Sequence, residues 1–407
     1  MKKLKILIST GHGRLHLFQS AEALQKLGLS VSILSGWFPK KTGTLFIKIL
    51  SILTSHKSLD SGLAKRKINV RRFHSLWYVE FLTQFLLIIS KKTKLFSKNF
   101  VVTFGWRLFS FCSKFFVKEY NVFHVRSGAG GIALKNAKKN KSLTIVDHSI
   151  AHPNFFEEYV NPIEKKYGLA PFISPKNSFW KLVIDDCVNA DVIVVNSGFV
   201  KQTFIDNGFQ SNKIKVNYLG VRDDFAFLKQ DYNIKSKLKI LFTGHFSYRK
   251  GAHIILEALS KLENQGISYE MIVVGKYDEM KNLINSFSNL NIVFVGHIPQ
   301  DELKSYLSTS DIYLFPSLGE GCASSGMEAL AAGLPVVATV ESGLPIKNLQ
   351  NGLIVESNNS DDVVKAILLL FEDKKIREKL GKNASFDISQ NYKWSNYAEN
   401  MRDIYNN

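Results

Sequence analysis

The chain has 407 residues, 45% of them hydrophobic, and a formal net charge of +18 at pH 7. It is too long for one typical domain and long enough for two domains with full cores. Its three widely separated cysteines, Cys112, Cys187 and Cys322, argue against a disulfide framework or a thiolate zinc site, and they fit a reducing compartment.

The first half of the chain alternates short apolar runs with helical patterns. The run at 4–10 follows a basic start, is too short for a signal peptide, and reads as a first strand. A helical pattern at 17–28 comes next, and further strand-like runs lie at 30–36, 120–128, 142–149 and 190–197. This alternation predicts parallel strands joined by crossover helices.

The excess positive charge belongs to this first half. Residues 1–150 hold 26 Lys and Arg against 5 Asp and Glu, a net +21. Such a surface attracts anionic membranes, nucleic acid or anionic substrates. The sequence shows no zinc-finger spacing and no RNP-type aromatic motif, so we expect no nucleic-acid partner.

Residues 81–120 combine this charge with aromatic side chains. They contain nine Phe and one Trp, with seven Lys or Arg against one Glu. The longest apolar run, 81–90, is about half the ~18 residues of a membrane span, so we expect no transmembrane anchor. A basic amphipathic surface for lipid headgroups is one reading.

A second reading is that part of this segment packs on the sheet. Leu108, Phe111, Cys112, Phe115 and Phe116 share one helical stripe, opposite basic residues. That stripe predicts a buried helix face. The two readings can hold together, with 81–96 at a membrane and 107–118 packed.

The strand and helix pattern restarts in the second half, with strand-like runs at 237–244, 269–275, 291–296, 311–317 and 335–339. We therefore predict an α/β protein of two Rossmann-like domains, residues 1–220 and 221–390, which meet near 219–225. An amphipathic helix at 391–407 is expected to pack back on the N-terminal domain.

The segment TGHFSYRKG follows the first strand of the second domain. Gly244 allows close approach to the backbone, Arg249 and Lys250 supply charge, and a helix start offers free N–H groups. These features suit a phosphate group, although the segment lacks the Walker A spacing.

The stretch FPSLGEGCASSGMEALAAGLPVVAT, residues 315–339, places two glutamates eight positions apart among small residues. Glu328 lies near a predicted helix start, where the helix dipole stabilises a carboxylate. Glu320 lies between two glycines and has less structural reason to be there. A carboxylate accepts two hydrogen bonds, which suits a vicinal diol. Together with the phosphate segment, the two glutamates suggest a sugar nucleotide.

This stretch resembles the E-x7-E motif of retaining glycosyltransferases of family GT4, which have the GT-B fold. LFTGHFSYRKGAHIILEAL, ADVIVVNSGFVKQTF, KVNYLGV and IPQDELKSYLSTSDIYLFPS are also similar to that family, in its usual order. The resemblance is strong over about 190–370, looser over 1–40 and 120–160, and absent over 41–120. It implies that the two domains face a cleft.

The resemblance also implies roles for individual residues. Glu320 would contact the donor sugar and Glu328 the ribose diol, while Lys250 and the backbone after Gly244 would hold the diphosphate. The remaining donor-binding positions would be Gly11, Gly13, His245, Arg249, Ser324 and Ser325. His245 stands where the family commonly has Arg, and Arg249 is expected to replace that charge.

The family also uses a histidine of the N-terminal domain near the transferred sugar. His148 follows a strand directly and His152 comes four residues later, and the sequence leaves both open as catalytic residues beside Glu320 and Lys250. The loop at Gly11 and Gly13 fails the dinucleotide fingerprint, because His16 stands where the third Gly should be.

The sequence thus predicts a retaining transfer of sugar from a nucleoside diphosphate sugar, used as co-substrate, to a saccharide or lipid-linked acceptor in surface polysaccharide or lipopolysaccharide synthesis. We expect no other cofactor, and because the chain has no D-x-D triplet we expect no metal. The expected location is the cytoplasm, extending to the inner face of the membrane through residues 81–120. The alternatives are a GT-B sugar-nucleotide epimerase and a non-catalytic nucleotide-sugar-binding membrane scaffold.

Overall fold

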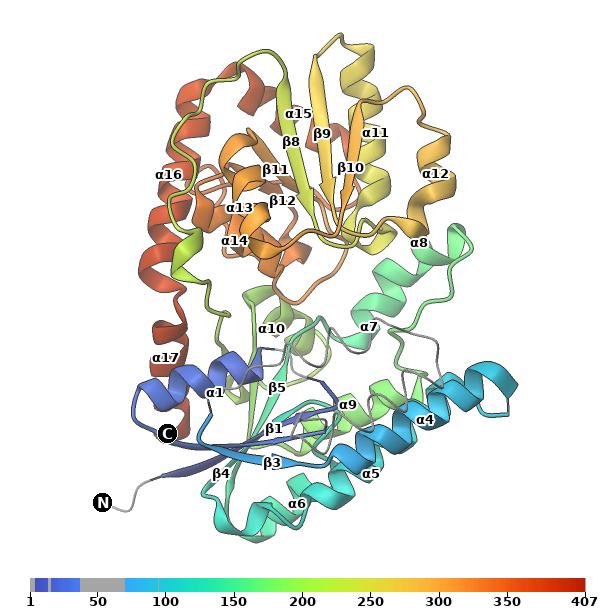
Figure 1. Cartoon of the computed structure of the whole chain (residues 1–407), viewed down its shortest axis with the longest axis vertical. Coiled ribbons are helices and arrows are strands. Elements are labelled where there is room, and N and C mark those ends of the chain that lie inside the picture. Colours follow the sequence, from blue (N-terminus) through green and yellow to red (C-terminus); the bar gives the residue numbers. More distant parts are fainter. Residues whose placement is uncertain (1–3, 14–15, 37–69, 94, 407) are drawn as a thin grey trace.

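The computed structural model describes residues 4–13, 16–36, 70–93 and 95–406, and these form two α/β domains stacked along the long axis of the molecule (Figure 1). Among the described residues, each domain is built on one parallel sheet, of seven strands in the N-terminal domain and six in the C-terminal domain. The predicted fold class is confirmed.

The N-terminal sheet has the strand order β3-β2-β1-β4-β5-β6-β7. Buried runs of β-branched and other apolar residues form its central strands, as expected for a sheet that is covered on both faces. The strands are β1 (Lys5–Gly11), β2 (Ser30–Ser35), β3 (Arg72–Ser75), β4 (Val122–Arg126), β5 (Leu143–His148), β6 (Val192–Val195) and β7 (Ile214–Val216).

Two layers of helices cover this sheet. One layer comprises α1 (Leu17–Lys26) and α17 (Trp394–Asn406), which share a hydrophobic core with β1 and β2. A second hydrophobic core, on the opposite face of the sheet, includes side chains from a second group of helices. Its helices are α4 (Trp77–Thr93), α5 (Lys98–Ser113), α6 (Gly131–Lys139), α9 (Ser178–Asn189) and α10 (Gly198–Ile205). The C-terminal helix therefore lies on the N-terminal domain, beside α1 (Figure 1).

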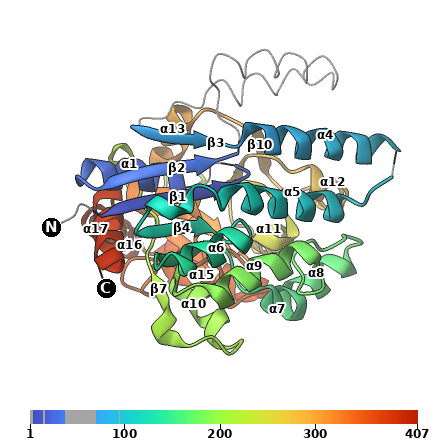
Figure 2. The same cartoon turned by 90° about the horizontal axis from the view of Figure 1, so that it is seen from below.

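Helices α4 and α5 run side by side and meet at the edge of the molecule (Figure 2). The sequence stripe on α5 is only partly right. Leu108, Cys112 and Phe116 pack against the core, but Phe111 is 46% exposed and Phe115 is 70% exposed. Trp106 and Phe109 are buried instead, because the face that meets the sheet is rotated toward them.

The C-terminal sheet has the order β10-β9-β8-β11-β12-β13 around one large core. Its strands are β8 (Leu238–Thr243), β9 (Tyr269–Val274), β10 (Ile292–Gly296), β11 (Ile312–Phe315), β12 (Val336–Ala338) and β13 (Leu353–Ile354). Its helices are α11 (Ala252–Asn264), α12 (Lys281–Asn285), α13 (Gln300–Thr309), α14 (Ser324–Ala332), α15 (Ser360–Glu372) and α16 (Lys374–Asn391).

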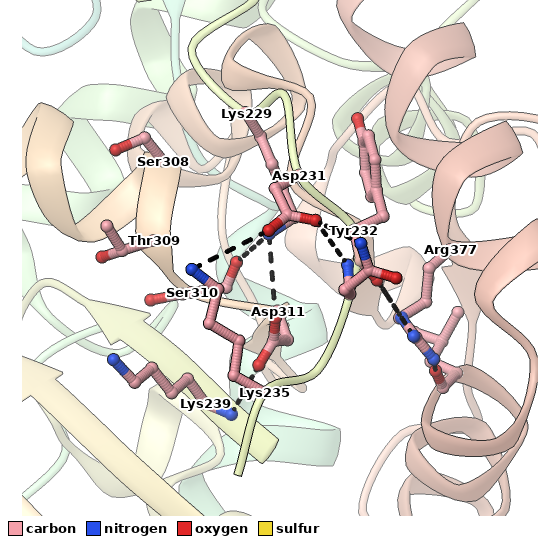
Figure 3. Close-up of polar contacts among 12 residues, drawn as sticks. Lys229, Asp231, Tyr232, Lys235, Lys239, Ser308, Thr309, Ser310, Asp311 and Arg377 are labelled. Atoms are coloured by element: carbon pink, nitrogen blue, oxygen red, sulfur yellow. Dashed lines mark hydrogen bonds and ion pairs between the residues drawn. The ribbon is translucent and has the colours of Figure 1, made fainter. Parts of the chain in front are cut away.

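A buried polar network ties the start of this domain to its last helices (Figure 3). Nζ of Lys229 donates to the carbonyl of Ser310 at 2.6 Å and lies 3.8 Å from Oδ1 of Asp311. Arg377, in α16, donates to the carbonyls of Tyr232 and Phe371. These contacts lie at the amino end of β11, away from the carboxyl ends where ligands bind in such sheets.

The chain crosses between the domains at residues 217–225 and again before α17. The two crossings touch, because the N–H of Val221 donates to the carbonyl of Tyr392 at 2.8 Å. A Cβ on Gly220 would lie 2.5 Å from the backbone nitrogen of Trp394, so this contact requires glycine.

The short helices α7 (Pro153–Phe155) and α8 (Asn161–Lys166) reach from β5 toward the other domain. Tyr167 stacks on Tyr248 of the C-terminal domain with ring centroids 4.1 Å apart.

Candidate active site

A cavity of about 290 Å³ lies where the two domains meet. Residues of both domains and of the final helix form its wall. The cavity lies beyond the carboxyl ends of the strands, which is the usual ligand side of an open α/β sheet. Its lining residues are His16, Gln19, Ser149, Asn196, Leu219, Gly220, Val221, Arg222, Gln300, Cys322, Ser324, Met327, Glu328 and Trp394.

The turn after β8 has the backbone that the sequence suggested. Gly244 has φ +122°, and Nζ of Lys250 would lie 3.3 Å from a Cβ at that position, so the lysine amine lies over this bare stretch of backbone. Gly251 has φ +76° and would bring a Cβ within 2.0 Å of the carbonyl oxygen of Pro316. His245, between these features, is exposed.

Glu320 contacts both cations of that turn. Its Oε1 lies 2.5 Å from Nη1 of Arg249 and 3.5 Å from Nζ of Lys250. Arg249 also donates to the carbonyl of Gly319 at 2.9 Å. The sequence analysis assigned Glu320 and these cations to one ligand but predicted no contact between them, and the structure pairs them directly at adjoining strand ends.

The first turn of α14 lies beside this cluster. Its N-cap residue, Ala323, supplies no side-chain hydrogen bond, which leaves the first backbone N–H groups of the helix for another acceptor. Ser324 lines the cavity. The hydroxyl of Ser325 lies 2.9 Å from that of Tyr313 and donates to the carbonyl of Thr243, which fixes the helix start against β8.

Glu328 lines the cavity from the same helix. Its Oε1 accepts a hydrogen bond from Nε2 of Gln300 at 3.0 Å, and Oε1 of Gln300 accepts one from Arg222 at 2.6 Å. Burial raises the pKa of Glu328 above its ordinary value, although Gln300 and Arg222 act to lower it. Glu328 is the fifth residue of α14, beyond the first turn, where the effect of the helix dipole falls off.

The N-terminal loop at Gly11 and Gly13 is described in part, since residues 14–15 lie outside the described residues. Gly11 has φ +66°, and a Cβ there would lie 2.5 Å from the ring of Trp106. Gly13 has φ +117°, and a Cβ there would lie 3.8 Å from Nη1 of Arg126. Both positions therefore favour glycine on conformational grounds.

The two candidate histidines have different surroundings. His148 is buried at the end of β5, and its Nδ1 lies 2.9 Å from the hydroxyl of Ser127, whereas its buried Nε2 has no hydrogen-bond partner among the described residues. Nδ1 of His152 accepts from the N–H of Asn154 and caps α7. Burial lowers the pKa of each to about 4, so both imidazoles are neutral at pH 7.

His16 is a site residue that the sequence analysis did not select. It precedes α1, lines the cavity and pairs with the buried Asp147 at 2.9 Å. In the sequence it figured only as a residue that breaks a glycine fingerprint, and no local pattern links it to Asp147.

The structure brings some of the predicted residues together and leaves others apart. Gly244, Arg249, Lys250 and Glu320 form one cluster, and Ser324 and Glu328 line the cavity with His16. His152 is occupied as a helix cap. Among the described residues, no group of three or more His, Cys, Asp or Glu side chains is arranged to hold a metal ion.

Comparison with known proteins identifies the C-terminal domain. Residues 224–386 match the family model described as Glycosyl transferases group 1. An uncharacterized glycosyltransferase of Methanocaldococcus jannaschii is 28% identical over 220 residues, covering 53% of this chain and 60% of that protein. The amylovoran biosynthesis glycosyltransferase AmsK of Erwinia amylovora is 33% identical over 148 residues, covering 34% of this chain and 36% of that protein. The chain thus aligns with less than two thirds of either relative.

The whole fold also matches solved structures. The Anabaena protein HepE, solved in complex with UDP, superposes with a TM-score of 0.65 at 16% identity, covering 98% of this chain and 99% of that one. At that identity the match shows the fold, and the two-domain GT-B architecture is confirmed.

Proposed function

We propose that this chain, whose residues 224–386 form a group 1 glycosyl transferase domain, transfers a sugar from a nucleoside diphosphate sugar to a saccharide or lipid-linked acceptor. The observation that carries the proposal is the contact of Glu320 with both Arg249 and Lys250, next to the free N–H groups of α14. A carboxylate for sugar hydroxyls and cations for a diphosphate are thereby held side by side.

The diphosphate would lie between the Gly244 turn and the start of α14. Lys250 and Arg249 would neutralise its charge, and the backbone N–H groups of Ser324 and Ser325 would donate to its oxygens. Glu328 would accept from the ribose hydroxyls, and Glu320 from hydroxyls of the transferred sugar. This places the sugar and the nucleoside on opposite sides of the diphosphate.

The proposed reaction retains the anomeric configuration. The bond from the anomeric carbon to the diphosphate oxygen breaks, and a bond to the acceptor oxygen forms on the same face of the sugar. The acceptor hydroxyl proton passes to the departing diphosphate. Arg249, Lys250 and the α14 dipole stabilise the charge that develops on that leaving group, so this mechanism requires no metal.

Of the two histidines, we assign His148 to the sugar side. Both rings pack on Phe204, but Nε2 of His148 is buried without a hydrogen-bond partner among the described residues, whereas His152 is engaged as the α7 cap and also packs on Phe209. A buried polar atom without a partner is costly and marks a place where a ligand group can supply the bond. His148 would act as a neutral hydrogen-bonding group, since its pKa of about 4 keeps it uncharged.

The acceptor would be a component of surface polysaccharide or lipopolysaccharide, presented at an anionic membrane on the cytoplasmic side. No helix in the described part of the chain has the length and apolar character needed to span a bilayer. The α4–α5 hairpin instead exposes Phe85, Phe100 and Phe104, and Phe100 stacks on Phe104 with centroids 6.4 Å apart. Lys91, Lys92 and Lys98 lie near the turn of this hairpin, where they would meet lipid phosphates.

The proposal is tested by a thermal-shift screen against UDP, GDP, ADP and TDP sugars, because a ligand of the native state raises its melting temperature. The sugar nucleotide that shifts the protein is then incubated with it alone and with acceptor preparations. Transfer that requires an acceptor supports the proposal, whereas conversion of the donor without acceptor would indicate an epimerase. No shift with any of the four classes would contradict donor binding.

A further inference from the structure

A buried carboxylate in the N-terminal domain contacts two histidines. Oδ1 of Asp147 lies 2.9 Å from Nε2 of His16, and its Oδ2 lies 3.4 Å from Nε2 of His124. Burial alone would raise the pKa of Asp147, but His16 and His124 outweigh that effect and hold the pKa well below its ordinary value. The carboxylate is therefore charged at neutral pH, and a buried charge of this kind depends on its partners.

These residues come from separate elements. His16 precedes α1, His124 lies in β4 and Asp147 lies near the end of β5, and β4 separates β1 from β5 in the sheet. The network continues to the C-terminal helix, where the hydroxyl of Tyr405 lies 2.8 Å from Nδ1 of His124. Asp147 thus fixes the His16 ring to the centre of the N-terminal sheet.

Of the four side chains in this network, His16 is the one that lines the cavity between the domains. Glu328, Gln300 and Arg222 line the same cavity from the other side of the cleft. Glu320, to which the sugar end of the donor is assigned above, lies outside this lining set. On the proposed function, Glu328 assigns this cavity to the nucleoside end of the donor, and Ser324 marks its diphosphate side.

We propose that His16 binds the nucleoside part of the donor from the N-terminal domain, opposite Glu328, and that Asp147 is the positioning residue that holds its ring. This inference rests on the proposed function. Asp147 engages Nε2 of His16, so Nδ1 is the ring nitrogen that meets the ligand. A nucleotide held by His16 and by Glu328 would contact both domains at once.

The decisive variant is His16→Gln. The amide nitrogen of glutamine can still donate to Asp147, but glutamine has no counterpart of Nδ1. We expect an unchanged melting temperature and about tenfold weaker binding of the nucleoside diphosphate, since one hydrogen bond to the ligand is lost. In transfer assays the KM for the donor rises while kcat is retained, which is the pattern for loss of a contact made equally in ground and transition states.

The measurement is calorimetric titration of the purified full chain with UDP, GDP, ADP and TDP, followed by the kinetics. Tyr405→Phe serves as the matched control, because it disturbs the same buried network at its far end without altering the cavity. We expect this variant to bind as the wild type does. Asp147→Asn should weaken binding in the same direction as His16→Gln.

The outcomes separate this inference from the proposed function. If the wild-type chain binds none of the four nucleotides, the proposed function fails and this inference fails with it. If the wild type binds and His16→Gln binds equally well, only the role of His16 is overturned. Equal weakening in His16→Gln and Tyr405→Phe would also overturn it, because the network would then have a structural role alone.

Discussion

Both domains hold a buried carboxylate beside basic side chains, Asp311 in the C-terminal domain and Asp147 in the N-terminal domain, and the two clusters differ in where they lie along their strands. Asp311 directly precedes β11 and contacts Lys229 (Figure 3). The nearby Arg377 donates a hydrogen bond to the carbonyl of Tyr232. Asp147 lies near the carboxyl end of β5 and contacts His16. Ligands bind beyond the carboxyl ends of parallel strands. The Asp311 cluster therefore stabilises the fold, whereas the Asp147 cluster faces the cleft.

The pKa values of the two carboxylates shift in opposite directions. Burial raises the pKa of Asp311, despite the hydrogen bond from the backbone of Lys239 and the charge of Lys229. For Asp147, the paired imidazoles outweigh burial and lower the pKa. Burial alone therefore does not tell whether a carboxylate has a structural or a functional role. Its position along the strand, and whether its partner lines a cavity, distinguish the two roles.

The largest effect on stability is expected from Arg377→Met. Arg377 donates to the carbonyls of Leu370 and Phe371 at the end of α15 and to that of Tyr232. Removing it leaves buried carbonyls unpaired and Asp311 with less positive charge nearby, at a cost of about 3 kcal/mol in the free energy of unfolding. Chemical denaturation measures this loss. A changed donor KM in the folded variant would contradict a purely structural role.

The next effect is on catalysis. Lys250→Ala should lower kcat by about 10² to 10³-fold, because a preorganised charge beside the leaving diphosphate is removed. Lys261→Ala is a matched control, since Lys261 lies in α11 and pairs with Asp361 at the surface. Melting temperatures close to that of the wild type would show that both variants fold. Retention of wild-type kcat in Lys250→Ala would contradict the proposed diphosphate site.

The candidate residues of the C-terminal domain could be selected from the sequence because they lie close together in it. The site consists of two local segments, residues 244–250 after β8 and residues 320–328 after β11, and these two strands are neighbours in one sheet. The ion pair between Arg249 and Glu320, 71 positions apart, required the fold to bring those segments together. The pair of His16 and Asp147 has no local signal at all, since strand order alone places them in contact.

The same limit applies to the α4–α5 hairpin. Amphipathic spacing predicted a helix over 107–118, of which α5 covers the part up to Ser113, but it assigned Phe111 and Phe115 to the packed face although both are exposed. Aromatic residues occur on several faces of α5, so the spacing of apolar residues could not show which face of the helix meets the sheet. Packing against Trp106 and Phe109 decides that rotation, and this depends on the sheet beneath.

Glu320→Gln should separate sugar transfer from nucleotide binding. We expect transfer to fall about 100-fold, because a charged contact to the sugar is lost. Binding of the nucleoside diphosphate should instead tighten by up to about fivefold, since Arg249 and Lys250 no longer pair with a carboxylate. Calorimetry and initial rates on the same preparation measure both changes. Weaker nucleotide binding in this variant would show that Glu320 supports the diphosphate directly.

Glu328 should give donor binding a dependence on pH. Burial raises the pKa of this carboxyl group, so protonation begins at a higher pH than for an exposed glutamate. In the proposed site the ionised form would accept both ribose hydroxyls, so the donor KM should rise as pH falls from 7 toward 5. Glu328→Gln should show about a tenfold higher KM at pH 7 and a flatter profile over that range. An identical pH profile in the variant would exclude Glu328 as the titrating group.

The smallest effect on donor binding is expected at the hairpin, whose role would be contact with a membrane, spread over many side chains. Phe100→Ser combined with Phe104→Ser should weaken binding to vesicles containing anionic lipid about tenfold or more, since two exposed rings can each bury apolar surface in the lipid interface. Phe386→Ser is the matched control, because Phe386 is 62% exposed on α16 of the other domain. Sedimentation with vesicles measures binding, and donor affinity in solution should be unchanged in both the double variant and the control. Equal loss of vesicle binding in the control and the hairpin variant would mean that exposed aromatic residues act non-specifically. Loss of vesicle binding in the hairpin variant alone would place membrane contact on the N-terminal domain, separate from the proposed nucleotide site of the C-terminal domain.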